Sequence, residues 1–140
     1  MIKALIDTNV ILDIALKREP FFEYASMIFD KIDDQILEGY ITASSITDIY
    51  YIASKQKDKL QARTFLLNLV QIMEVIGVDK DIVIEALECD IPDFEDAIQV
   101  FSAKSNSIDL IITRNVSDFG LSGLKVLTPQ EFIQKLDNSD

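Results

Sequence analysis

Residues 2–9 read IKALIDTN, a short apolar run that ends abruptly in the three polar residues Asp7, Thr8 and Asn9. A run of this length with a sharp polar end is typical of a buried strand. The apolar-rich stretch that follows, residues 10–16, suits a helix. These two elements predict the start of an α/β domain, with Asp7 at the point where the first strand ends.

The alternation of short strands and helices continues to the end of the chain. Further strands are expected at residues 40–43, 74–78, 109–113 and 124–127. Helices are expected at residues 20–32 and 80–88, from Asp93 and from Pro129, with a helical hairpin over residues 44–73 that Ser44 or Ser45 would cap. Such alternation favours an α/β fold with a parallel sheet covered on both faces. No linker or repeat interrupts it, so residues 1–140 are expected to form a single domain.

The composition excludes several classes of protein. The chain has no histidine, which excludes Ser-His-Asp triads, histidine general bases and ordinary histidine-ligated zinc. No apolar run approaches the roughly 18 residues of a membrane helix, and the first residues become acidic too soon for a signal peptide. The single cysteine, Cys89, builds no disulfide framework. A cytoplasmic protein without membrane contact is therefore expected.

The formal net charge of −11 bears on the possible partners. Nucleic-acid binders are usually basic, because phosphate contacts dominate their affinity, so the charge taken alone argues against RNA. That argument weakens if several carboxylates are gathered to hold Mg²⁺ or Mn²⁺, which prefer oxygen ligands and reverse the local field. The same charge predicts affinity for a basic protein partner.

Four aspartates are predicted to meet at one edge of the sheet, where open α/β sheets bind their ligands. Asp7 follows the first strand, and Asp118 follows the fourth. Asp48 lies in the first turn of the helix after the second strand, and Asp96 in the first turn of the helix before the fourth. Like charges held close together repel and raise each other's pKa. Such a group is costly unless a cation compensates it, so the convergence favours a metal site.

Each of these aspartates also has a purely structural interpretation. Asp7 could cap the first helix, and Asp48 and Asp96 each stand third after a possible cap residue, as in a capping box. Asp118 could form an Asx-turn within residues 117–120. Capping explains each residue taken singly, but it does not explain why all four would meet at one edge.

Three stretches of the chain resemble the PIN-domain family. They are residues 4–13 (ALIDTNVILD), residues 41–51 (ITASSITDIYY), and residues 93–98 (DFEDAI) followed by residues 110–119 (LIITRNVSDF). The resemblance spans nearly the whole chain in the right order. It implies a three-layer α/β/α sandwich around a central parallel sheet of about five strands. It also implies a metal-dependent endoribonuclease that hydrolyses RNA phosphodiester bonds, as the toxin of a type II toxin–antitoxin pair, with a cognate antitoxin and a homodimer as expected partners.

The resemblance assigns roles residue by residue. Three residues match the acidic metal ligands, for Mg²⁺ or Mn²⁺: Asp7, Asp96 and Asp118. Asp48 completes the expected catalytic set, although many members of the family carry Glu at its position. The shorter side chain loses about 1.5 Å of reach, which a bridging water could span. Four residues match polar positions that support the carboxylates or line the site: Thr8, Asn9, Thr113 and Asn115.

The roles of several neighbouring charges stay open. Glu95 is either an outer acid of the site or a solvated side chain of the first helical turn. Arg114 either holds a phosphate or pairs with a carboxylate. A basic cluster has a solvated helix face as its default interpretation and an RNA-backbone contact as the alternative; it consists of Lys55, Lys57, Lys59 and Arg63.

Three other functions compete with a nuclease. A haloacid-dehalogenase-like phosphatase would use Asp7 as its nucleophile, but that chemistry resembles Asp-x-Asp, and Asn9 stands at the second position here. A receiver-like regulatory module expects paired acids after the first strand and a lysine after the last, whereas Lys125 falls within the last strand. A catalytically inactive PIN-fold binding module would keep the acids without turnover.

Overall fold

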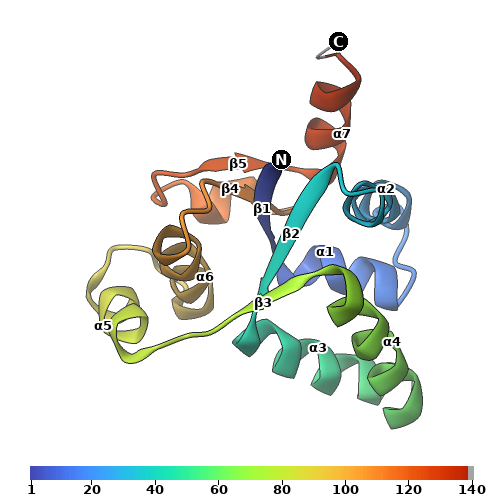
Figure 1. Ribbon diagram of the computed structural model, residues 1–140. Coiled ribbons are helices and arrows are strands. Elements are labelled where there is room, and N and C mark those ends of the chain that lie inside the picture. Colours follow the sequence, from blue (N-terminus) through green and yellow to red (C-terminus); the bar gives the residue numbers. More distant parts are fainter. Residues whose placement is uncertain (139–140) are drawn as a thin grey trace.

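The central sheet of the computed structural model has five strands, all parallel (Figure 1). The structure describes residues 1–138, so the last two residues of the expected domain lie outside it. The strands run side by side in the order β3-β2-β1-β4-β5. Their bounds are Ile2–Ile6 (β1), Leu37–Thr42 (β2), Glu74–Ile76 (β3), Leu110–Ile112 (β4) and Lys125–Leu127 (β5). Because β1 is central, Asp7 lies between the carboxyl ends of β2 and β4.

Helices cover both faces of this sheet, which confirms the predicted three-layer α/β/α sandwich (Figure 1). Ala4 and Ile6 of β1 pack into one apolar core with side chains of α1, α2, α3, α4 and α7, while Leu5 packs into a second core with α5 and α6. None of the helices among residues 1–138 is long and apolar enough to cross a membrane. The helices are α1 (Thr8–Ala15), α2 (Phe22–Asp33), α3 (Ala43–Gln56), α4 (Lys59–Ile72), α5 (Lys80–Glu88), α6 (Phe94–Ser105) and α7 (Pro129–Asp137), with a short 3-10 helix, η1 (Val116–Phe119).

The sequence pattern misplaces the starts of three helices. The first of them, α1, begins at Thr8, two residues before the expected start. Pro20 lies in the turn before α2, not in its first turn. Neither Ser44 nor Ser45 caps α3, because β2 runs directly into that helix and Thr42 supplies the cap, accepting a hydrogen bond from the Ser45 backbone at 3.2 Å. The earlier start moves Asp48 from the first turn of α3 into the second.

Candidate active site

Asp7 is a buried carboxylate held by two side chains from distant parts of the chain. Its residue is 6% exposed. Thr113 Oγ1 donates a hydrogen bond to Oδ2 at 2.7 Å, and Gln99 Nε2 donates one to Oδ1 at 2.9 Å. Asp7 occupies the N-cap position of α1, but its side chain makes no capping hydrogen bond. The interpretation of Asp7 as a helix cap is therefore wrong, and the two donors instead fix the orientation of its carboxylate.

Gln99 is a residue of this arrangement that the sequence pattern did not single out. It lies in α6, one turn after Asp96, and is 1% exposed. Its neighbours in sequence, Ile98 and Val100, are buried and apolar. A polar side chain on the buried side of a helix needs a partner there, and this feature could have identified Gln99 beforehand. Among residues 1–138, its second polar atom, Oε1, is buried without a hydrogen-bond partner.

Asp7 and Asp118 both lie close enough to Asp96 to act on it electrostatically. Burial, followed by the charges of Asp93, Asp7 and Asp118, raises the pKa of Asp96 from 3.8 to about 7. The cap of α6 is Asp93, whose carboxylate accepts a hydrogen bond from the Asp96 backbone at 2.9 Å. Asp118 lies on η1, directly after β4, and is exposed. The structure thus brings three of the four predicted acids together, with Asp7 and Asp118 both beside Asp96.

The fourth predicted acid, Asp48, contacts Glu95 across the gap between α3 and α6. A side-chain hydrogen bond with Asp48, then partial burial and the charges of Asp48, Asp93 and Asp7, raise the pKa of Glu95 to about 7. Two carboxyl groups can share a hydrogen bond only if one of them carries the proton. Because Asp48 lies in the second turn of α3, its predicted place in a capping box is wrong. Glu95 is therefore more than a solvated side chain. Together with the four predicted aspartates it forms what we call the acidic group.

The four predicted supporting residues lie at this edge but play different parts. Thr113 is the one with a hydrogen bond to Asp7, and the backbone N–H of Asn115 donates to Thr113 Oγ1 at 3.0 Å. Thr8 does not bind a carboxylate; its hydroxyl donates to Ser45 Oγ at 2.8 Å and so ties α1 to α3. Asn9 Oδ1 is buried and has no hydrogen-bond partner within residues 1–138.

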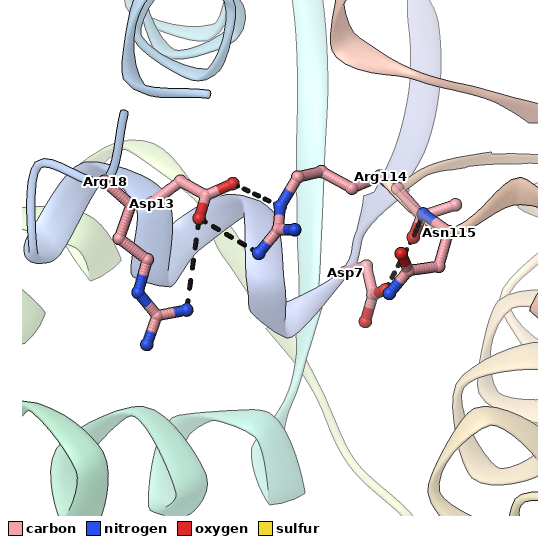
Figure 2. Close-up of polar contacts among 6 residues, drawn as sticks. Asp7, Asp13, Arg18, Arg114 and Asn115 are labelled. Carbon is pink, nitrogen blue, oxygen red and sulfur yellow. Dashed lines mark hydrogen bonds and ion pairs between the residues drawn. The ribbon is translucent and has the colours of Figure 1, made fainter. Parts of the chain in front are cut away.

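Arg114 pairs with a carboxylate that the sequence pattern did not place in the site. Its Nε donates to Asp13 Oδ2 at 2.7 Å and its Nη2 to Oδ1 at 3.2 Å (Figure 2). The guanidinium also lies 4.0 Å from the centroid of the Phe21 ring. Of the two alternatives left open for Arg114, carboxylate pairing is the one observed. The pair fastens the loop between β4 and η1 to helix α1.

The acidic group suits a hard divalent cation, although its side chains are not gathered around one point. Among residues 1–138, no three acidic or thiol side chains are arranged to hold a metal ion as they stand. The donors are nevertheless all carboxylate oxygens, which Mg²⁺ and Mn²⁺ prefer. Burial of Asp96 and the hydrogen bond between Asp48 and Glu95 contribute most to the raised pKa values of Asp96 and Glu95, and the neighbouring carboxylate charges add to both. The chemistry of these donors, and not their present geometry within residues 1–138, therefore matches such an ion.

Comparisons with known proteins agree with this architecture. The PIN domain family matches residues 3–117. Ribonuclease VapC1 of Aquifex aeolicus (strain VF5) is 30% identical over 138 residues, covering 95% of this chain and 94% of that protein. DNA-bound VapBC from Salmonella typhimurium is similar in structure, with a TM-score of 0.70, 17% identity, and coverage of 92% of this chain and 99% of that one. VapC20 from Mycobacterium tuberculosis, a toxin that cleaves the sarcin–ricin loop, gives a TM-score of 0.69 at 12% identity, over 86% and 95% of the two chains.

The chain belongs to the PIN-domain family, as the extent of the family match and of the VapC1 relative shows. This membership supports the nuclease and not the competing functions. The haloacid-dehalogenase-like alternative finds no support in these comparisons.

Proposed function

We propose that this chain is a ribonuclease that hydrolyses RNA phosphodiester bonds with Mg²⁺ or Mn²⁺, as the toxin of a toxin–antitoxin pair. The observation that carries the proposal is the environment of Asp7, a buried carboxylate oriented by Thr113 and Gln99. Its charge contributes to the raised pKa of Asp96 beside it. The extent of the identity with Ribonuclease VapC1 supports the same activity here. The chain would act as a single PIN-like nuclease domain.

The metal ligands in this proposal are Asp7, Asp96 and Asp118, with Asp48 and Glu95 adding negative charge beside them. When bound there, a divalent ion would offset charge on the phosphodiester and make water a better nucleophile at neutral pH. Gln99 and Thr113 hold Asp7 in one orientation, which matters because residues behind a metal ligand set its geometry and affinity.

Two measurements on the purified protein test this activity together. Labelled RNA should be cleaved with Mg²⁺ or Mn²⁺ and left intact with chelator. Asp7→Asn should abolish cleavage, whereas Asp30→Asn, the same substitution on the exposed face of α2, should leave it unchanged. Cleavage that survives chelator would contradict the metal requirement, and an active Asp7→Asn protein would remove Asp7 from the site.

Asp7→Asn also tests metal binding without any RNA. A ligand that binds only the folded state stabilises it, by about 2.7 kcal/mol at a ligand concentration of 100 times Kd. Excess Mn²⁺ should therefore raise the melting temperature of the parent and not that of Asp7→Asn. In chelator the variant should melt higher than the parent, because one repelling carboxylate is gone. Identical melts in both conditions would show that Asp7 holds no ion.

The proposed partners are RNA as substrate, a cognate antitoxin protein, and a second copy of the chain in a homodimer. The antitoxin is proposed because structural neighbours include a toxin–antitoxin complex from Klebsiella pneumoniae, similar with a TM-score of 0.67 at 23% identity. A basic side chain of the antitoxin, such as arginine, would pair with the acids in place of the metal. We propose that the protein and these partners are located in the cytoplasm. Co-purification from the native host tests this partner, and a chain recovered alone whose overexpression leaves growth unchanged would contradict the toxin role.

A further inference from the structure

Tyr51 is an exposed aromatic side chain at the margin of the acidic group. The residue is 60% exposed, although it lies three positions after Asp48 on the same helix, α3. It contributes to an open depression of about 460 Å³ that includes carboxyl groups of the candidate site. The residues that line this depression are Thr8, Thr47, Asp48, Tyr51, Ile52 and Glu95. An exposed tyrosine therefore faces the same hollow as the acids.

Lys55 places a positive charge over the ring of Tyr51, one helical turn further along α3. Its Nζ lies 4.3 Å from the ring centroid, which is within cation–π range. Lys55 belongs to the basic cluster noted in the sequence, and it is the member that joins this depression through its contact with Tyr51. Asp48, Tyr51 and Lys55 recur at spacings of three and four, so they follow one face of the helix. The face thus runs from carboxylate to aromatic ring to ammonium group.

We propose that Tyr51 and Lys55 form a subsite for one nucleotide of single-stranded RNA, the base stacking on the Tyr51 ring and the Lys55 ammonium contacting a backbone phosphate. This inference rests on the proposed ribonuclease function and adds the place where a nucleotide next to the cleaved bond is held. Stacking platforms beside positive charge are the usual means of holding single strands without reading their sequence.

The net charge of the chain favours a subsite of this kind for an RNA substrate. A chain of net charge −11 as a whole repels phosphate groups. Without a bound cation the acids at the site would weaken the binding of an RNA strand, so the affinity that remains would depend on groups such as Tyr51 and Lys55. Stacking on an aromatic ring is insensitive to this repulsion, and Lys55 offsets it locally. A protein partner on this surface is the alternative outcome, because tyrosine is also frequent in protein interfaces.

Binding of RNA in chelator tests the subsite apart from cleavage. The probe is a fluorescein-labelled single-stranded RNA, intact or with one base removed at each position in turn, and its Kd is measured by anisotropy. The Kd of Tyr51→Ala for intact RNA should be about tenfold higher than that of the parent, within the range for one stacked base. Removing one particular base should weaken binding to the parent by a similar factor and leave binding to Tyr51→Ala unchanged. Tyr51→Phe, which keeps the ring, should bind as the parent does.

Lys55→Gln and Lys57→Gln form a matched pair, since each removes one positive charge from the same exposed end of α3. Lys55→Gln should reduce the slope of log K against log salt by about 0.7, as for one lost phosphate contact on a single strand. Lys57→Gln should keep the slope of the parent.

Equal RNA affinity for the parent and Tyr51→Ala would overturn the subsite even if the parent cleaves RNA normally. Loss of a co-purifying protein from Tyr51→Ala alone would then assign the surface to protein docking. A parent that binds RNA with the predicted base dependence but never cleaves it would instead contradict the proposed function and leave the subsite standing.

Discussion

Arg114 and Asp13 form a two-pronged ion pair between the loop after β4 and helix α1. The two contacts measure 2.7 and 3.2 Å, and the Asp13 side chain is 1% exposed. Arg18 lies at the same carboxylate, 4.0 Å away (Figure 2). Thr113, which holds Asp7, directly precedes Arg114 in the chain. The pair therefore fixes the loop that also carries Asn115 and leads to Asp118.

Arg114→Met should lower the free energy of unfolding by about 3 kcal/mol, because it leaves the buried Asp13 carboxylate without its main partner. Arg18→Met removes the more distant cation of the same carboxylate and should cost less than 1 kcal/mol, as for a weak surface pair. Urea unfolding of the parent and both variants at neutral pH measures the difference. Equal losses for the two variants would mean that the bidentate contact of Arg114 stabilises the fold no more than the single contact of Arg18.

The loss in the free energy of unfolding that Arg114→Met causes should become smaller as the pH falls. Burial raises the pKa of Asp13 above 3.8, while the hydrogen bond and charge of Arg114 counteract that rise. Without Arg114 the pKa of Asp13 rises further, so the folded variant binds a proton that the unfolded chain releases. Stability of the variant is then lost as pH rises from 3.8 through the raised pKa. Unfolding curves at a series of pH values check this, and a deficit that is constant with pH would contradict it.

The stability of the metal-free protein should fall as the pH rises from about 4 to about 7. The pKa values of Asp96 and Glu95 are both raised to about 7 in the folded state, from 3.8 and 4.5. Folded protein therefore holds protons that the unfolded chain has released, and stability falls as pH rises through this range. Asp96→Asn and Glu95→Gln should each flatten the dependence and raise the melting temperature at pH 8 in chelator. Asp30→Asn should keep the pH dependence of the parent. If Asp30→Asn flattened this dependence equally, the effect would come from the net charge of the protein and not from the site.

Gln99→Leu should weaken Mn²⁺ binding roughly tenfold or more, because residues that orient a metal ligand typically contribute 10- to 100-fold in affinity. The free energy of unfolding should also fall, because the buried Asp7 carboxylate loses one donor, although leucine offsets part of this loss by removing the unpartnered Oε1. Ser102→Ala is the matched control, because Ser102 is also buried and polar and lies one turn further along α6. Titration of Mn²⁺ followed by thermal melts measures both variants. Equal Mn²⁺ affinity for Gln99→Leu and the parent would mean that Thr113 alone suffices to orient Asp7.

Asp118→Asn should reduce the stabilisation by Mn²⁺ more than Asp48→Asn does. The charge of Asp118 acts on Asp96, together with that of Asp7, whereas Asp48 acts on Glu95. The proposed ligand set lies in the first of these groups. The same melts compare the two isosteric substitutions at one pH. A larger loss for Asp48→Asn would move Asp48 into the ligand set and Asp118 out of it.

The sequence by itself determined the order of the elements and the edge at which the acids gather. Apolar runs such as residues 2–6 mark buried strands, because a strand covered on both faces has no room for polar side chains. A parallel sheet then forces the ends of its strands to one edge, so Asp7 and Asp118 could be placed there without coordinates. The resemblance to the PIN-domain family followed from the same residues in the same order.

Tertiary structure alone decided which side chains meet at that edge. Gln99 and Asp7 are separated by 92 residues, and Arg114 and Asp13 by 101, and each pair faces across elements whose relative rotation no local pattern records. The same holds for Asp48, for which the local pattern predicts a place in a capping box. In the structure β2 continues directly into α3, so Thr42 is the cap and Asp48 lies outside the capping box. Helix caps depend on where a helix begins, and that point is set by packing against the sheet as much as by the cap residue. Contacts between distant side chains depend on that packing alone.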